Sequence, residues 1–132
     1  MIEIKNETEK VILVGVSLSD QDDTKESLEE LKDLVSTAGA ETVGMVIQNR
    51  EQQHPGTYVG KGKIEELKSM IWELRATGIV CDDELSPAQM KNLQDELDVK
   101  VMDRTLIILD IFAARASTSE GKIQVELAQL RY

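Results

Sequence analysis

The sequence predicts an α/β fold, in which a small four-stranded, mainly parallel sheet is flanked by helices and followed by a two-helix antiparallel hairpin. Two observations lead to this prediction. Short apolar runs rich in Val and Ile alternate with amphipathic stretches as far as residue 104, which is typical of parallel strands joined by crossover helices. Beyond that point the alternation stops, and two helix-like stretches follow each other. With 132 residues, 41% of them apolar, the chain can form one packed core.

Four apolar runs are expected to form the strands. The first of them, "KVILVGV", is continuously apolar, which indicates a central strand that is buried on both faces. The third contains "GIVC" and the fourth contains "VKVMD". The expected strands cover residues 10–16, 41–50, 78–83 and 99–104.

The first two helices have recognisable boundaries in the sequence. Asp22 or Asp23 can cap the first helix, whose apolar stripe ends at Gly39, a residue suited to the position just past a helix. The second helix is expected to begin near Ile64, after the Gly/Lys stretch "HPGTYVGKGK", and to stop at Gly78. The two helices share the similar strings "LEELK" and "IEELK", which is weak support for a repeated unit.

The third helix and the hairpin complete the pattern. Ser86 is expected to cap a helix that has Pro87 at its first position, where proline is tolerated. The hairpin helices are "TLIILDIFAARA" and "GKIQVELAQLRY", joined by "STSEG". We therefore expect an α/β domain over residues 1–104 and a helical hairpin subdomain over residues 105–132, truncated at its C-terminal end because the last helix reaches Tyr132 without a stop signal.

Charge is distributed unevenly along the chain. The net charge of −10 disfavours binding of nucleic acid by overall positive potential. Residues 1–98 carry 10 Lys/Arg against 21 Asp/Glu, whereas residues 99–132 carry 5 against 4. Contacts with a polyanion are therefore expected at the basic residues of the last quarter or next to the Gly/Lys stretch. These residues are Arg104, Arg115, Lys122, Arg131, Lys61 and Lys63.

Cysteine content and hydropathy suggest a cytoplasmic protein. Cys81 is the single cysteine, so the chain cannot form an internal disulfide or a cysteine-based metal site. No apolar stretch approaches the roughly 20 residues of a membrane span, and the N-terminus lacks the apolar segment of a signal peptide.

The Gly/Lys stretch raises the question of nucleotide binding. Gly56 and Gly60 are one residue too close for a G-x-x-x-x-G-K-[ST] motif, and no G-x-G-x-x-G fingerprint is present. Lys61 and Lys63 would nevertheless oppose the dipole of the following helix unless an anion lies nearby. The alternative is that both lysines are solvated in a flexible loop.

Acidic residues follow the predicted strands and suggest a second class of function. Asp22, Asp82 and Asp103 would all project at the carboxyl edge of the sheet, where they could hold Mg²⁺ in a metal-binding or receiver-like phosphoacceptor module. Carboxylates at helix N-termini are also what capping and the helix dipole favour. No catalytic set is evident, because His54 is alone and Cys81 has no paired base.

Three strings resemble the N-terminal region of the HflX-type ribosome-associated GTPases. They are "TYVGKGKIEEL", "CDDELSPAQMKNL" and, above all, "VMDRTLIILDIFAARASTSEGKIQVELAQLRY". The match covers nearly the whole chain. The motifs G-x-x-x-x-G-K-[ST], D-x-x-G and N-K-x-D are absent, so the GTPase domain, with its GTP and Mg²⁺, is expected beyond Tyr132 and no cofactor or GTP hydrolysis is expected in this chain.

The resemblance implies a function on the large ribosomal subunit. Such proteins bind rRNA near the intersubunit face and, with GTP, split stalled ribosomes. The loop between the hairpin helices would reach toward the peptidyl transferase centre, and here it corresponds to Arg115 through Lys122. Ser117 stands where a second arginine is common, which would weaken the loop's affinity for rRNA. Lys61 and Lys63 are expected to make a secondary contact.

The expected partners follow from the same resemblance. They are the large subunit with its rRNA and the chain's own GTPase domain. The last apolar stripe, Ile123, Leu127 and Leu130, is expected to pack on the preceding helix or on another copy of the chain, so a homodimer through this helix is a further expectation.

Overall fold

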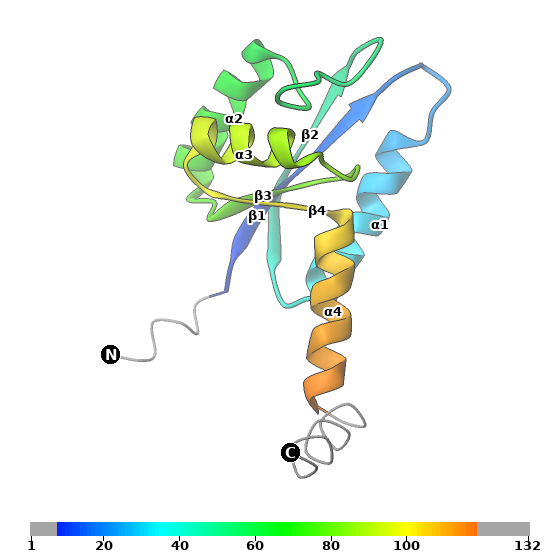
Figure 1. The fold of residues 1–132 in the computed structure, drawn as a ribbon, viewed down its shortest axis with the longest axis vertical. Coiled ribbons are helices and arrows are strands. Elements are labelled where there is room, and N and C mark those ends of the chain that lie inside the picture. The colour runs from blue at the N-terminus through cyan, green and yellow to red at the C-terminus, as the bar shows by residue number, and fades with distance from the viewer. Residues whose placement is uncertain (1–7, 119–132) are drawn as a thin grey trace.

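A computed structural model describes residues 8–118 of the chain (Figure 1). Four parallel strands form one sheet in the order β2-β1-β3-β4. The predicted α/β class with a four-stranded parallel sheet is confirmed. The strands are β1 (Lys10–Ser17), β2 (Glu41–Asn49), β3 (Gly78–Cys81) and β4 (Lys100–Asp103). The helices are α1 (Thr24–Thr37), α2 (Lys61–Leu74), α3 (Pro87–Leu97) and α4 (Arg104–Thr118).

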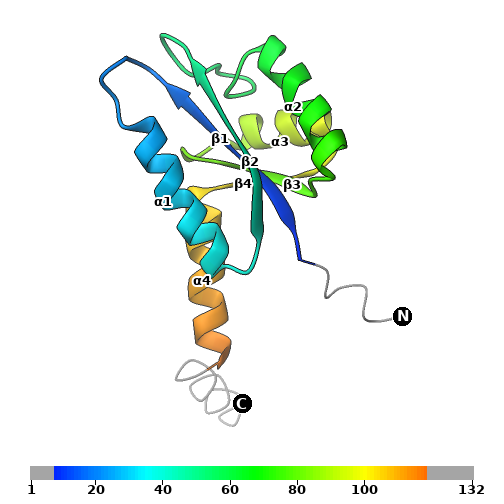
Figure 2. The ribbon, with the colours of Figure 1, turned by 180° about the vertical axis from the view of Figure 1, so that it is seen from behind.

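Helices cover both faces of the sheet and create two cores. Helices α1 and α4 lie on one face, while α2 and α3 lie on the other (Figures 1 and 2). Strand β1 supplies both cores because its alternate side chains point to opposite faces: Ile12 and Val14 pack toward α2 and α3, and Leu13 packs toward α1. Continuous burial of β1 confirms that it is the central strand.

Helix α1 ends as predicted but is not capped as predicted. Gly39 has a φ of +95°, a left-handed conformation that favours glycine and ends the helix. Asp23 occupies the N-cap position without a side-chain capping hydrogen bond, and the neighbouring Asp22 accepts a long one, 3.4 Å, from the Thr24 amide.

Helix α2 differs from the prediction at both ends. It begins at Lys61, three residues before Ile64, because the two glycines flanking Lys61 do not prevent a first helical turn. It ends at Leu74, where Arg75 adopts a left-handed conformation with φ of 56°, so Gly78 is not the stop residue. Gly78 instead opens β3, and a Cβ there would lie 2.7 Å from the Lys100 carbonyl oxygen of the neighbouring strand.

The last two helices start directly after well-defined caps. Ser86 Oγ accepts a hydrogen bond from the Gln89 amide at 3.1 Å, and Gln89 Oε1 accepts one from the Ser86 amide at 3.0 Å, which confirms the predicted cap. Helix α4 follows β4 without a connecting loop, and its residue Ile107 is buried in the core formed with α1. Beyond this contact α4 projects past the sheet (Figure 1).

The first helix of the predicted hairpin is longer than the sequence predicts. Helix α4 runs to Thr118, so Arg115 and Ser117 lie in its last turn rather than in a loop. The second hairpin helix, Lys122 and the apolar stripe from Ile123 to Leu130 lie outside the described residues. The domain boundary after residue 104 stays a prediction. Between residues 8 and 118, no helix is long and apolar enough to cross a membrane.

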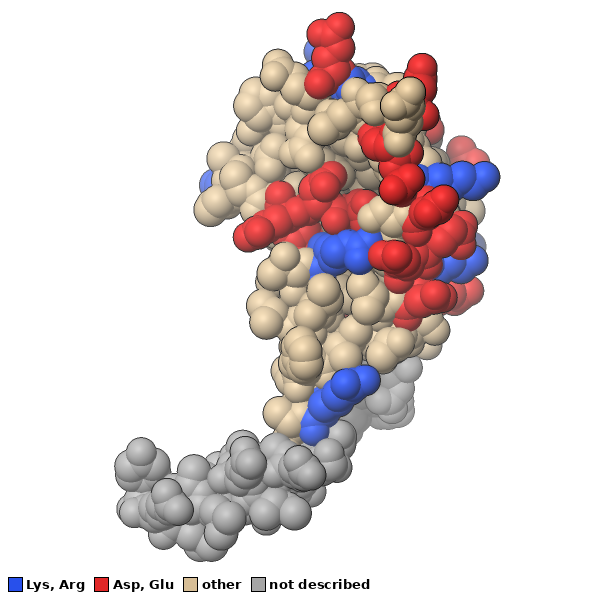
Figure 3. Space-filling model, turned by 90° about the vertical axis from the view of Figure 1, so that its right-hand side faces the viewer, with Lys and Arg blue, Asp and Glu red and all other residues tan. Residues whose placement is uncertain are grey.

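Charge on the surface follows the elements. Acidic side chains gather over the part of the molecule that holds the sheet and α1, whereas the surface of the projecting helix is mostly uncharged (Figure 3). Helix α1 alone carries four acidic residues and two lysines. The α1 face is therefore a poor surface for a polyanion.

Candidate functional site

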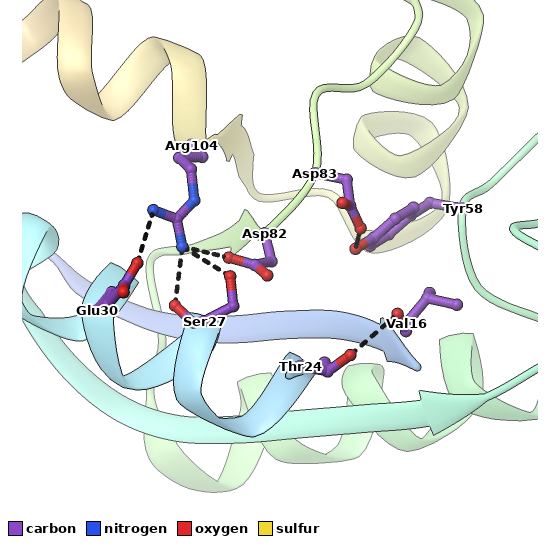
Figure 4. Close-up of polar contacts among 8 residues, drawn as sticks. All are labelled: Val16, Thr24, Ser27, Glu30, Tyr58, Asp82, Asp83 and Arg104. Carbon is purple, nitrogen blue, oxygen red and sulfur yellow. Dashed lines mark hydrogen bonds and ion pairs between the residues drawn. The ribbon is translucent and has the colours of Figure 1, made fainter. Parts of the chain in front are cut away.

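Arg104 joins three elements at the base of α4. Its Nη2 atom donates to Asp82 Oδ1 at 2.8 Å, to the Ser27 carbonyl oxygen at 2.8 Å and to Ser27 Oγ at 2.9 Å (Figure 4). Its Nη1 atom lies 3.7 Å from Glu30 Oε1. The guanidinium group therefore ties α4 to α1 and to the end of β3, and it is already occupied by partners within the chain, which disfavours the predicted contact with a polyanion.

Asp103 performs a second structural task at the same junction. Its side chain is buried, and Oδ1 accepts from the Leu106 amide at 3.0 Å, which satisfies a free N–H of the first turn of α4. Oδ2 accepts from the Leu85 amide at 2.9 Å. The carboxylate thus caps α4 and fixes the β3–α3 loop.

Asp22 organises the loop between β1 and α1. It accepts hydrogen bonds from Thr24 Oγ1 at 2.8 Å, from the Leu18 amide at 2.6 Å and from Ser17 Oγ at 2.9 Å. These hydrogen bonds lower the pKa of the Asp22 carboxyl to about 2, and the bond from Thr24 has the largest effect. Desolvation acts in the opposite direction but is outweighed.

Each of the three carboxylates of the predicted metal site therefore has its own partners within the chain. Asp22 holds a loop, Asp82 pairs with Arg104, and Asp103 caps a helix. Within residues 8–118, no three His, Cys, Asp or Glu side chains come together in a way that could hold a metal ion. This arrangement disfavours the metal-binding alternative, and only Asp103 has the capping role that the sequence also allowed.

Tyr58 fills the region in which an open α/β sheet commonly binds ligands. The chain crosses from one side of β1 to the other between β2 and β3, so the topological switch point lies at the carboxyl ends of β1 and β3. Tyr58 is fully buried in the core cluster that also contains Val16 and Cys81, which lie at those strand ends. Its hydroxyl donates to Asp83 Oδ2 at 2.6 Å (Figure 4). Burial raises the pKa of Tyr58 well above its usual range, and the hydrogen bond to the Asp83 carboxylate contributes to the same shift.

The stretch before α2 is an ordered turn. His54 Nδ1 accepts from the amides of Gly56 and Thr57 at 3.0 and 3.1 Å, so the ring proton of neutral His54 lies on Nε2. Helix α3 holds the turn through Gln89, which donates to the His54 carbonyl oxygen at 2.9 Å, and through Asn92, which donates to that of Gly56 at 2.9 Å. The turn places Tyr58 in the core, and both lysines lie in the first turn of α2 rather than in a loop, with Lys61 exposed to solvent as the sequence alternative expects.

The predicted basic residues lie in two separate places. Lys61 is exposed in the first turn of α2, and Lys63 pairs with Glu66 at 3.0 Å. Arg115 lies in the last turn of α4, two residues before Ser117 in the sequence. Helix α2 and the far end of α4 lie at opposite ends of the molecule (Figures 1 and 2). The structure therefore does not bring Lys61 and Lys63 together with Arg115.

Comparison with known proteins defines the family. A family described as GTP-binding GTPase N-terminal matches residues 25–113, which include all four helices in whole or in part. The chain belongs to this family.

Relatives of this GTPase N-terminal domain carry the name GTPase HflX, which confirms the resemblance seen in the sequence. The protein of that name from Lacrimispora saccharolytica is 70% identical over 132 residues, covering 100% of this chain and 31% of the relative. The Escherichia coli protein is 44% identical over 124 residues, covering 94% of this chain and 29% of the relative. The chain thus spans about 30% of the length of the curated relatives that it matches.

A solved structure supports the same arrangement of the domain. A GTP-binding protein from the hyperthermophilic archaeon Sulfolobus solfataricus, crystallised in complex with GDP, matches with a TM-score of 0.63 and 28% identity. The match covers 93% of this chain and 36% of that chain. The α/β fold of this family member is therefore found within a longer protein that binds a guanine nucleotide.

Sequence reasoning missed the two residues that organise the domain. The charge pattern predicts only a polyanion contact for Arg104, and no sequence motif assigns a role to Tyr58. A signal for Tyr58 was present, because a large aromatic residue stood among glycine, proline and threonine in a predicted loop. A signal for Arg104 was its position directly after the last strand, beside Asp103.

Proposed function

We propose that the chain is the ribosome-docking N-terminal region of an HflX-type GTPase that binds the rRNA of the large subunit and splits stalled ribosomes. In this proposal a separate GTPase domain of the same protein holds GTP and Mg²⁺ and hydrolyses the nucleotide, while the present chain holds neither. The protein acts in the cytoplasm. Its partners are the large subunit and its own GTPase domain, with a homodimer through the last helix as a further proposal.

The observation that carries this proposal is the way in which α4 is mounted. Arg104 and Asp103 fix the base of the helix to α1 and to the β3–α3 loop, and the helix then leaves the sheet and projects away from it (Figure 1). Arg115 lies near the projecting end. A rigid helix is suited to carry a basic loop into a narrow RNA site, because the orientation of the loop is set at the base of the helix.

The distribution of surface charge also supports contact with rRNA through the projecting helix α4. The acidic surface over α1 repels phosphate, so contact with rRNA is favourable away from this surface, as at the projecting end of α4. Arg115 and Lys122 are then the principal phosphate contacts, Ser117 a weaker neighbour, and Lys61 and Lys63 a secondary contact.

Binding of the full-length protein to isolated 50S subunits tests the proposal. Arg115→Gln with Lys122→Gln should weaken binding and reduce the magnitude of the salt slope, log K against log salt concentration, by about 1.4 to 1.8. The matched control is Lys25→Gln with Lys32→Gln, which removes the same charge from two exposed positions on the acidic α1 face. Equal loss in both variants, or no 50S binding by the full-length protein, would contradict the proposal.

A further inference from the structure

We infer that the outer face of α2 is a second RNA contact, in which an unpaired base stacks on Trp72 and the neighbouring phosphates are bound by Lys68 and Arg75. This inference rests on the proposed function and deepens it, since it identifies single-stranded RNA as the ligand of a face well separated from α4. It is distinct from the contact expected at the tip of the hairpin.

The residues of this face form one continuous stripe. The first four follow one another at intervals of four, three and four residues, the spacing at which side chains lie on the same side of a helix, and Arg75, just past the helix end, lines the same hollow as the fourth of them, Trp72. All of them are exposed. The α2 stripe consists of Lys61, Glu65, Lys68, Trp72 and Arg75.

Trp72 is the large apolar side chain of the α2 stripe. Its side chain is 85% exposed, although tryptophan has a large apolar surface that is usually buried. Beside it lies an open hollow of about 800 Å³ that is lined by Ile71, Glu73, Arg75 and Ala76 together with Trp72 itself. The indole therefore offers a π-face with space next to it for a flat ring.

The cations of the stripe are placed on either side of this ring. In the part of the chain that the structure describes, no ion pair or hydrogen bond involves the side chain of Lys61 or Arg75. Lys68 pairs with Glu65 at 3.1 Å and Glu96 at 3.5 Å, and these contacts raise its pKa and keep it charged. Lys68 and Arg75 are seven residues apart, about 10 Å along a helix, and Trp72 lies between them.

The balance of charge on α2 differs from that on α1. Helix α2 carries three lysines and three glutamates and is followed by Arg75, whereas α1 carries two lysines and four acidic residues. A polyanion that avoids the α1 face can therefore approach α2, although the attraction is modest. The affinity must then come largely from stacking, which Trp72 supplies.

The composition of the stripe favours a base over a protein partner. Protein interfaces are organised around a cluster of buried apolar anchors, and the stripe has a single large apolar side chain among charged ones. Single-stranded RNA needs one aromatic face for a base and separate cations for its phosphates. Paired RNA cannot use the site, because its bases are stacked within the helix and cannot reach the indole.

Trp72 fluorescence provides a direct test, because Trp72 is the only tryptophan in the chain. Titration of the 132-residue chain with a ten-nucleotide single-stranded oligoadenylate should quench the emission in a saturable way, and an RNA duplex of equal length should not. In parallel, binding of the labelled oligonucleotide should weaken roughly 5- to 100-fold in Trp72→Leu. Trp72→Phe, which keeps an aromatic face, should recover most of the affinity.

Matched variants separate the stripe from general surface effects. Arg75→Gln should weaken binding and flatten its salt dependence, whereas Lys91→Gln removes the same charge from the exposed face of α3 and should change neither. Leu18→Ala removes another exposed apolar side chain, on the β1–α1 loop, and should also leave binding unchanged. Wild-type affinity in Trp72→Leu, or equal quenching by the duplex, would overturn the inference.

Experiments with the full-length protein distinguish this inference from the proposed function. If 50S binding depends on Arg115 and Lys122 but is unchanged in Trp72→Leu, the second contact is wrong and the proposed function stands. If Trp72→Leu weakens 50S binding without affecting the oligonucleotide, the partner is a ribosomal protein and the inference is also wrong. If the oligonucleotide binds as expected while 50S subunits are not bound, the proposed function fails and the RNA site remains.

Discussion

Tyr58 shows how a single residue can determine what a fold is available to do. It combines a left-handed backbone, with φ of 67°, with complete burial, which is uncommon for a bulky residue. The turn around His54 and the hydrogen bond to Asp83 hold it in this conformation. Because Tyr58 is buried together with Val16 and Cys81 at the carboxyl ends of β1 and β3, its side chain takes up part of the region where folds of this kind usually bind a ligand.

Replacement of Tyr58 by Phe should lower the free energy of unfolding by about 1 kcal/mol at pH 7. The change removes the hydroxyl that donates to Asp83, and the cost is at the lower end of the usual range because Asp83 is only partly buried and can bind water instead. Urea unfolding followed by circular dichroism would measure it.

The pH dependence of stability reports on the burial of Tyr58 and, after that, on its hydrogen bond to Asp83. Since the folded state raises the pKa of Tyr58, it favours the neutral phenol, and this stability is complete below the unfolded pKa of about 10 and is lost as pH rises above it. The wild type should therefore lose more stability between pH 9 and pH 11 than Tyr58→Phe. An identical loss in both proteins would show that the phenol is not buried against Asp83.

Asp22 should act at the opposite end of the pH scale. Its folded pKa of about 2 lies below the ordinary value of 3.8, so the carboxylate stabilises the folded state above pH 4 and this contribution disappears as pH falls toward 2. Asp22→Asn should lower the urea midpoint at pH 7, and the difference from the wild type should shrink by pH 2.5. The control Asp20→Asn, in the same loop, should change the urea midpoint little at pH 7. If it lowers the midpoint as much as Asp22→Asn does, the loss is due to net charge alone.

At the scale of elements, helix boundaries show where sequence patterns are sufficient and where they fail. Gly39 and Ser86 were predictable because each acts through its own backbone or through a residue three positions away. The end of α2 was not predictable, because Arg75 adopts a left-handed conformation there. In a sequence, this conformation is usually indicated by glycine or asparagine. The contacts of Arg104 could not be inferred either, because its partners Ser27 and Asp82 lie 77 and 22 residues away along the chain.

The anchoring of α4 can be tested through Arg104. Arg104→Met should lower the free energy of unfolding by roughly 2 kcal/mol, because it leaves Asp82, whose side chain is 9% exposed, without its counter-charge. The estimate is below that for a fully buried pair because the Arg104 side chain is 25% exposed. Hydrogen exchange at the amides around Ile107 should also accelerate if the helix loosens from α1.

Two further variants separate this ion pair from a general effect of charge. Arg104→Met with Asp82→Asn should recover part of the lost stability, since the double variant no longer contains an unpaired, nearly buried carboxylate. Arg75→Met removes an arginine from an exposed position and should have little effect on stability. Additive losses in the double variant would show that Arg104 and Asp82 are not coupled.

At the scale of the whole molecule, the described domain has a fold associated with nucleotide binding, but several features that could have held a ligand make contacts within the chain. The Gly/Lys stretch lacks the spacing of a phosphate-binding loop, Tyr58 fills the switch point, and the carboxylates at the sheet edge are occupied by internal contacts. The sequence alone could not decide between an acidic metal site and a set of caps, because that choice depends on which neighbour each carboxylate contacts. The structure provides those neighbours.

The 132-residue chain should therefore show no thermal stabilisation by Mg²⁺, GTP or both together. A site with a dissociation constant of 10 μM would, at 1 mM ligand, add about 2.7 kcal/mol to the free energy of unfolding and raise Tm by roughly 10 °C in a domain of this size. We expect shifts below about 1 °C in all three conditions and no release of phosphate above the rate in buffer. A rise with Mg²⁺ alone would restore the metal-binding alternative at Asp22, Asp82 and Asp103, whereas a rise that requires GTP would place a nucleotide site within this chain and contradict the proposed division of labour between it and a separate GTPase domain.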